Sequence, residues 1–381
     1  MKILMLSIFA PHFFNWTEQL NDSGHEVYWL DIFDSNTKVE QIDFAEQIIG
    51  WRYRWNHPGR YFLKKNAIGL TRLINIFNER NLQRQLEKQI KRIEPDVVHS
   101  FVMYLGGAPA LPVMKKFPDL QWVYTAWGSD MYYYQKRPEH LEGMRKTLPH
   151  MNYMFADCRR DYSIAKDHGF KGEFLGVYPG GGGFDFESFD PFMMDEEDRN
   201  VILIKGYQGL HGQCISVLRG ILELKEKLEA YKIVVFGAAP EVFKFVETSS
   251  IKEFKNLEVV GKLPYQKLME LMGQSFIYIG NSSSDGMPNT LLEAIIMEVF
   301  PIQSNPGGAT AEIIDHKRNG LLIEDPENFK AIAGLLKKAI DNPELRINAI
   351  NWNSDRIKPE LARERIRKRV LEAYQKIEEN L

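Results

Sequence analysis

The sequence predicts an α/β protein built from two parallel-sheet domains. Short apolar segments alternate with amphipathic segments along the 381 residues, and this alternation occurs twice. Between the two sets lie residues 178–200, in which four glycines are followed by aromatic and acidic residues. Such a stretch fits a linker better than a strand or a helix. We therefore expect two sheets of parallel strands, each covered by its own helices.

Each strand is expected at an apolar run. The runs of the first set are residues 2–9, 26–33, 96–102, 121–127 and 152–157, and those of the second set are 201–205, 232–237, 257–261, 276–280 and 300–304. Amphipathic patterns predict helices over 212–231 and 264–274. The chain ends in a charged amphipathic pattern, which predicts a last helix over 357–381.

The composition excludes several classes of protein. The net charge is −3, so no global basic field favours nucleic acid as a partner. Cys158 and Cys214 are the two cysteines, and their wide separation fits a reducing compartment rather than a disulfide framework. The apolar N-terminal run is interrupted by Pro11 and His12, which is typical of a strand and not of a signal peptide. We therefore expect a cytoplasmic protein.

Residues 51–92 are strongly basic, with eleven lysines and arginines against two acidic residues. Aromatic residues are interleaved with these charges, among them Trp51, Tyr53, Trp55, Tyr61 and Phe62. Basic and interfacial aromatic residues together are typical of a segment that contacts an anionic membrane surface. This contact would make the protein peripheral on the inner face of the membrane. The alternative is a solvated helix beside a loop whose aromatic side chains fill the core.

Residues 282–299, SSSDGMPNTLLEAIIMEV, run from a polar loop directly into an apolar helix. The loop follows the predicted strand 276–280, at the edge where open α/β sheets bind ligands. Pro288 suits the first helical position because its missing N–H would have no partner there. The helix dipole and the first backbone amides would then form a phosphate site. These amides belong to Asn289, Thr290 and Leu291.

Two carboxylates flank this predicted phosphate site. Asp285 lies in the loop, and Glu293 lies about 6 Å further along the helix axis. Because carboxylates accept hydrogen bonds from hydroxyls and do not hold phosphate, a nucleoside diphosphate sugar fits the pattern. Glu293 would accept from the ribose hydroxyls and Asp285 from those of the hexose. The alternatives are that Asp285 caps the helix or its turn and that Glu293 is a paired surface acid.

The block 282–322 resembles the signature of the retaining glycosyltransferases of GT-B family four. Their pattern is E-x7-E, followed by P-V, GG-x-x-E and NGLL. Asp285 and Glu293 hold the two acid positions, and Glu312, Asn319 and Gly320 match the later pieces. The first acid is thus an aspartate, one methylene shorter than the usual glutamate.

The resemblance implies the GT-B fold, in which two Rossmann-like domains face a cleft. The acceptor-binding domain would cover 1–180 with the helix 357–381 crossing back to it, and the nucleotide-sugar-binding domain would cover 181–356. The implied reaction moves a hexosyl unit, with retention, from a UDP- or GDP-sugar to a hydroxyl of a glycan or lipid-linked acceptor. This chemistry serves the biosynthesis of lipopolysaccharide and other cell-surface polysaccharides.

The resemblance also assigns residues on the donor side. Lys205 and His211 stand where the family has an Arg and a Lys that contact the pyrophosphate, although His211 is equally compatible with an ordinary loop histidine. Lys205 would form the catalytic set with Asp285 and Glu293 by stabilising the charge of the leaving diphosphate. The other donor-binding candidates are Gly206, Gly237, Lys262, Leu263, Gly286, Met287 and Pro288, together with the three helix residues named above.

Three residues are candidates on the acceptor side: His99, Trp127 and Asp130. Phe101 and Trp127 replace two histidines that the family usually has there. His99 could line the acceptor site or be a core residue, and Asp130 could contact the acceptor or cap a helix.

No obligatory metal is expected, because Asp185 and Glu187, which have the spacing of metal ligands, lie in the predicted linker. The nucleotide sugar would be a co-substrate. Two other functions fit the sequence, a sugar-nucleotide 2-epimerase of the same fold and a non-catalytic protein that binds sugar nucleotides.

Overall fold

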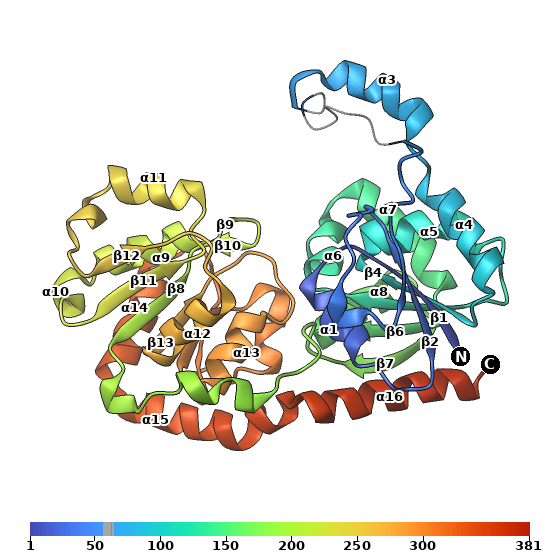
Figure 1. Ribbon diagram of the computed structural model, residues 1–381. Helices are drawn as coiled ribbons and strands as arrows, with labels where there is room; N and C mark the ends of the chain where they lie inside the picture. The colour runs from blue at the N-terminus through green and yellow to red at the C-terminus, as the bar shows by residue number, and fades with distance from the viewer. Residues whose placement is uncertain (56–61, 63–64) are drawn as a thin grey trace. The chain divides into compact units, whose positions relative to one another are not determined.

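The computed structural model describes residues 1–55, 62 and 65–381. It divides into two compact α/β units (Figure 1). Unit 1 contains Met1–Ala156, Tyr162–Gly182 and Arg367–Leu381, and unit 2 contains Asp157–Asp161 and Gly183–Ile366. Tyr61, an aromatic residue of the basic segment, lies outside the described residues.

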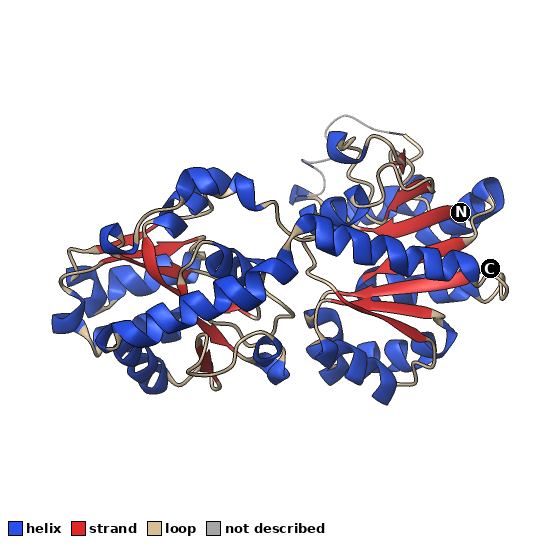
Figure 2. Ribbon diagram, turned by 90° about the horizontal axis from the view of Figure 1, so that it is seen from below, coloured by secondary structure: helices blue, strands red, loops and turns tan. Residues whose placement is uncertain are grey.

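Unit 1 is built on a seven-stranded sheet with the order β3-β2-β1-β4-β5-β6-β7, in which every neighbouring pair is parallel. The central strands are almost entirely buried, as expected for a parallel sheet covered on both faces. Figure 2 shows helices on both sides of these strands. The strands are β1 Lys2–Ser7, β2 Glu26–Asp31, β3 Glu46–Ile48, β4 Val97–Phe101, β5 Gln121–Ala126, β6 Tyr153–Ala156 and β7 Glu173–Val177.

The helices of unit 1 follow its strands in an alternating order. They are α1 Pro11–Glu18, α3 Ile68–Asn78, α4 Leu82–Ile93, α5 Ala108–Met114, α6 Ser129–Tyr132, α7 Pro138–Thr147, α8 Arg159–Asp167 and the last helix, α16 Arg363–Glu379. The first residues of α8 and of α16 belong to unit 2. None of the helices in the described part of the chain is both long enough and apolar enough to cross a bilayer.

Unit 2 is built on a six-stranded parallel sheet with the order β12-β11-β8-β13-β14-β15. Its strands are β8 Val201–Lys205, β11 Lys232–Phe236, β12 Leu257–Val259, β13 Ser275–Gly280, β14 Phe300–Ser304 and β15 Leu321–Ile323. A separate hairpin pairs β9 Gln208–Gly209 with β10 Gly212–Gln213. The helices are α9 Cys214–Leu222, α10 Lys225–Leu228, α11 Pro240–Thr248, α12 Tyr265–Gly273, α13 Asn289–Ile296, α14 Phe329–Asp341 and α15 Pro343–Trp352.

The expected strands are all present, and the three strands that the sequence analysis missed in the two large sheets lie at sheet edges. They are β3, β7 and β15, with three to five residues each. An edge strand needs no long apolar run, because one side of it has no neighbouring strand. Two expected helices are shorter than predicted. The pattern 212–231 begins with the hairpin and then forms α9 and α10, and α16 begins at Arg363 because Ala362 is extended.

Candidate functional site

The strand order of unit 2 places a ligand-binding edge between β8 and β13. The chain adds β11 and β12 on one side of β8 and then returns to place β13 on its other side. In open α/β sheets, ligands bind outside the carboxyl ends of the strands at such a reversal. Lys205 is the last residue of β8, and the loop 281–288 follows β13. Because β8 and β13 are parallel, both features lie at the same edge of the sheet.

The loop 281–288 leads into α13. Pro288 is the N-cap of α13 and not its first residue as the sequence predicts, because its ψ of 122° keeps it extended. The carbonyl of Pro288 accepts a hydrogen bond from the amide of Leu291 at 3.0 Å. This bond corrects the expectation that the Leu291 amide faces a phosphate. The amides of Asn289 and Thr290 remain in the first turn, outside the helical hydrogen-bond ladder.

Glu293 is the fifth residue of α13, and only 8% of it is exposed. Side chains of a helix tilt toward its N-terminus, so this carboxyl group points back toward the first turn. Burial raises the pKa of Glu293 from 4.5 to about 7, against the opposing effects of a hydrogen bond with Tyr265 and the charge of Lys205. Glu293 is therefore a buried acid, and the alternative of a paired surface acid is wrong.

Lys205 lies near Glu293, and His211 lies near the loop that precedes α13. The Lys205 charge acts on the Glu293 carboxyl, and its ammonium group lies 4.8 Å from the ring centre of Tyr207. His211 lies in the turn of the β9–β10 hairpin, with Nδ1 3.4 Å from the carbonyl oxygen of Ser284. The structure thus brings both pyrophosphate candidates to the same edge.

Two glycines among the donor candidates have clear local roles. A Cβ atom at Gly206 would lie 2.7 Å from backbone atoms of the turn after β11, so glycine allows the two strand ends to approach. Gly237 has a φ of +63°, and its amide donates to the carbonyl of Gly261 at 3.1 Å. Its amide is therefore already used. Lys262 and Leu263 lie in the loop after β12, with Lys262 exposed and Leu263 partly buried.

Asp285 is held in place through its backbone. Its carbonyl accepts from Arg160 at 2.8 Å, and the same guanidinium nitrogen donates to the carbonyl of Pro306 at 2.6 Å. The Asp285 carboxylate accepts from the adjacent amide of Gly286 at 3.0 Å. The N-cap position of α13 is Pro288, which makes no side-chain cap hydrogen bond, and the hydrogen bond described for Asp285 closes its own turn and not the helix.

Asp157 is a buried carboxyl group that the sequence analysis missed. Its Oδ2 accepts from the amide of Met287 at 3.3 Å, and its Oδ1 is buried with no hydrogen-bond partner among the described residues. A Cβ atom at Gly286 would lie 2.1 Å from Oδ2, so only glycine fits there. Burial and then the charge of Asp161 raise the pKa of Asp157. The available signal was its position directly after a buried strand.

Asp157, Cys158 and Asp161 place possible metal-ligand atoms within 4.8 Å of one another. Burial raises the pKa of the Cys158 thiol, whereas metal ligation requires the thiolate. Asp161 is paired with Arg160 at 2.8 Å. This donor set therefore suits a metal ion poorly.

In unit 1, His99 is a core residue, and the structure corrects its assignment to the acceptor side. It is fully buried, with Nδ1 2.6 Å from the Tyr374 hydroxyl and Nε2 2.7 Å from the Thr125 hydroxyl. Its ring stacks on Phe101 with centroids 4.2 Å apart. Burial lowers the pKa of His99 to about 3, so the imidazole is neutral.

Asp130 is also buried, and all its observed partners are structural. Its carboxylate accepts from the amides of Met103 and Trp127, at 2.8 and 2.9 Å, and from the Tyr124 hydroxyl at 2.6 Å. Burial raises the pKa of Asp130, and the hydrogen bonds oppose that rise. Trp127 is only partly buried and packs edge-on against His12. Of the three acceptor candidates, Trp127 alone keeps an accessible surface.

The comparisons with known proteins match both units. Residues 2–158 match the family model described as glycosyl transferase 4-like, and residues 195–354 match that of the glycosyl transferases group 1. The chain is 26% identical over 116 residues to a glycosyltransferase 1 domain-containing protein of Xenopus tropicalis, covering 30% of this chain and 32% of that protein. It is 25% identical over 252 residues to a putative teichuronic acid biosynthesis glycosyltransferase of Bacillus subtilis, covering 63% and 60%.

The matches thus span less than two thirds of either relative. Among solved structures, Anabaena HepE in complex with UDP superimposes with a TM-score of 0.70 at 12% identity, over 99% of this chain and all of that one. This likeness establishes the GT-B fold, with two Rossmann-like parallel-sheet domains.

Proposed function

We propose that this chain, which has the GT-B fold and carries domains matching two glycosyltransferase families, is a retaining glycosyltransferase. It moves a hexosyl unit from a nucleoside diphosphate sugar to a hydroxyl of a glycan or glycolipid acceptor in cell-surface polysaccharide synthesis. The observation that carries the proposal is the buried Glu293 beside Lys205 at the reversal point of the unit 2 sheet. A buried acid with a raised pKa at a ligand-binding edge is a typical functional group.

The charges at this edge would determine where the diphosphate, the ribose and the hexose of the donor bind. The diphosphate lies against the first turn of α13, where the helix dipole and Lys205 supply positive charge. Glu293 accepts hydrogen bonds from the ribose hydroxyls, and Asp285 accepts from the hexose. UDP is the favoured nucleotide, since the HepE structure is a complex with UDP.

Catalysis rests on stabilising the departing diphosphate. As the glycosidic bond breaks, negative charge grows on the phosphate oxygen that leaves the sugar, and Lys205 and the amides of the first turn would stabilise that charge. The acceptor attacks from the same face, and the donor phosphate accepts its proton, so no separate base is assigned. The leaving diphosphate carries that proton away.

The basic segment 51–92 would place the enzyme on an anionic membrane surface, as a peripheral protein of the inner face. Within it, exposed apolar residues accompany the charges, among them Trp55, Phe62 and Phe77. Apolar and basic residues together bind anionic interfaces, at roughly 1 kcal/mol per basic residue near the surface. The synthesis of surface polysaccharide takes lipid-linked acceptors from such a membrane.

The proposal is tested first by nucleotide binding. UDP, GDP and their glucose and mannose derivatives are added to the protein, and thermal unfolding is followed. A true donor should stabilise the protein by about 2.7 kcal/mol at a hundred times its Kd. Glu293→Ala should abolish this effect, whereas Glu226→Ala, at an exposed position of α10, should preserve it.

Turnover then separates the proposed reaction from the two other functions. Incubation of the donor with glycan and lipid acceptors should transfer the sugar, and NMR of the product should show the anomeric configuration of the donor. An epimerised sugar formed without any acceptor would instead identify a 2-epimerase. Nucleotide binding that survives Glu293→Ala, with no turnover, would identify a binding protein.

A further inference from the structure

Helix α3 of unit 1 leaves most of its large apolar side chains exposed. Leu70, Leu73 and Phe77 share one face at helical spacing, and they are 50%, 61% and 69% exposed. Asn78, the last residue of the helix, is fully buried and exchanges two hydrogen bonds of 2.9 Å with the backbone of Trp55. Helices of water-soluble proteins place their apolar stripe against the core. The exposed apolar face of Leu70, Leu73 and Phe77 therefore indicates an apolar partner.

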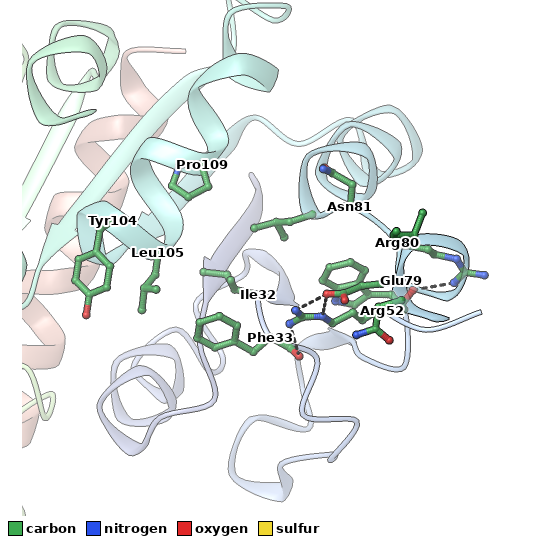
Figure 3. A pocket seen from close by; sticks show the side chains of 13 residues that line it. Ile32, Phe33, Arg52, Glu79, Arg80, Asn81, Tyr104, Leu105 and Pro109 are labelled. Atoms are coloured by element: carbon green, nitrogen blue, oxygen red, sulfur yellow. Dashed lines mark hydrogen bonds and ion pairs between the residues drawn. The ribbon is translucent and has the colours of Figure 1, made fainter. Parts of the chain in front are cut away.

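A cavity of about 700 Å³ adjoins this helix. This volume lies within the range of roughly 300–1,000 Å³ that is typical of small-molecule sites. Ile76 of α3 lines the cavity and is itself 69% exposed, so the cavity is continuous with the apolar face of α3. Its other apolar lining residues are Trp51 and Leu82 together with Ile32, Phe33, Tyr104, Leu105 and Pro109, which are labelled in Figure 3.

One end of the cavity carries arginine residues. Arg52 forms an ion pair with Glu79, so its charge is compensated. The adjacent Arg80 is exposed and donates to the carbonyl oxygen of Trp51 at 2.8 Å, and no ion pair to Arg80 occurs among the residues that the structure describes. In the sequence, residues 51–92 include eleven basic and two acidic residues, in a chain of net charge −3. The charge of this site is therefore complementary to an anion.

We propose that the cavity binds the hydrocarbon chain of a phosphate-bearing lipid, with the phosphate at Arg80, and that this lipid carries the acceptor of the transfer reaction. The inference rests on the proposed function, which requires a hydroxyl acceptor. An amphiphile of this kind uses each feature of the site, because its chain fills the apolar cavity and its anionic group meets the cation at the rim. A second copy of the chain is disfavoured as the occupant, since two such basic surfaces would repel each other.

The test uses the full-length protein and farnesyl phosphate at concentrations below its micelle formation. Equilibrium dialysis should show saturable binding with one molecule per chain, and farnesol should bind at least tenfold more weakly. Inorganic phosphate should not compete at concentrations that saturate the site with farnesyl phosphate. Competition by inorganic phosphate at comparable concentrations would show a simple anion site and would overturn the proposal.

Two variants separate the chain from the phosphate. Leu105→Trp fills the cavity and should weaken both farnesyl compounds at least tenfold, whereas Phe243→Trp, at an exposed position of α11, should change neither. Arg80→Gln should reduce the affinity for farnesyl phosphate to that for farnesol and leave farnesol unchanged. The control Arg84→Gln, exposed on α4, should have little effect on either. Binding that is insensitive to both cavity variants would refute the site.

Two further measurements keep the outcome interpretable. Stabilisation by UDP in the Leu105→Trp variant shows that the protein still folds and binds its donor. Lipid binding that fails while UDP binding persists refutes this inference and leaves the proposed function standing. Lipid binding without any nucleotide binding refutes the proposed function and with it the acceptor role of the lipid, and it leaves the lipid site itself standing. Sedimentation that shows a dimer abolished by Leu73→Asp would identify α3 as a subunit interface and overturn the lipid site.

Discussion

Replacing Glu293 with glutamine should stabilise the protein at alkaline pH and leave its stability nearly unchanged at acidic pH. Burial raises the pKa of this carboxyl from 4.5 to about 7. Below pH 4.5 the group is neutral in the folded and unfolded states, so the substitution removes no charge. Above pH 7 the folded state must hold a buried carboxylate, which glutamine does not require. At about 1.4 kcal/mol per pH unit, the difference approaches roughly 3 kcal/mol.

The sign follows from proton binding in the two states. Between pH 4.5 and about 7 the folded protein holds a proton on Glu293 that the unfolded chain has lost, so wild-type stability falls as the pH rises through this window. The amide oxygen of glutamine can still accept a hydrogen bond from Tyr265. The advantage of the variant should therefore grow across the window and level off above it.

The assay is urea unfolding of the wild type and of Glu293→Gln at a series of pH values. Effects of other titrating groups cancel in the difference between the two proteins. Glu226→Gln, at an exposed position of unit 2, is the control, because it removes no buried carboxyl group. A Glu293→Gln difference that is constant across the window, or that favours the wild type above pH 7, would refute the reasoning.

Three further predictions address packing, a buried base and the membrane. Gly286→Ala should cost roughly 1–3 kcal/mol of stability and weaken UDP binding, because the added Cβ would collide with Asp157. A Cβ at Gly261 meets no atom within 4 Å, so Gly261→Ala should change neither stability nor UDP binding. Urea unfolding measures the stability and calorimetry the binding. The wild type should lose stability as the pH falls from 6.5 toward 3, because His99 takes up a proton at a higher pH in the unfolded chain than in the folded protein. His99→Phe should remove this part of the pH dependence and should lower the stability near pH 7 by about 1–3 kcal/mol. Phe77→Asp should leave unfolding unchanged within about 0.5 kcal/mol, because the side chain is 69% exposed, but it should reduce binding to phosphatidylglycerol vesicles in a flotation assay.

Sequence periodicity was sufficient for the strands that are buried on both faces. The runs at 201–205 and 300–304 became β8 and β14 with unchanged bounds, because a parallel strand with neighbours on both sides is buried on both faces and is therefore mostly apolar. The edge strands β3, β7 and β15 escaped, since each is short and is defined by a single neighbour. Their positions depend on pairing with residues that are remote in the chain, which local pattern does not report.

For the candidate site, local sequence predicted which groups would be present but not what surrounds them. The acids Asp285 and Glu293 and the helix start were visible in one continuous stretch. The burial of Glu293, its contact with Tyr265 and the insertion of Asp157 beneath Gly286 required the fold. His99 is the opposite case, because a residue that the sequence offered as an acceptor-side candidate lies in the core. Its hydrogen-bond partners there, Tyr374 and Thr125, make a core position possible for a histidine.

The sequence by itself determined two α/β domains, the loop-to-helix junction with its acids, and the basic segment 51–92, because each depends on residues that are close together in the chain. The tertiary structure decided where β8 meets β13, how strongly Glu293 holds its proton, and which side of α3 faces outward. These properties arise from strand order and from burial, and both depend on contacts between residues far apart in the chain. The pKa of Glu293 and the exposed side of α3 are therefore defined only when those contacts have formed.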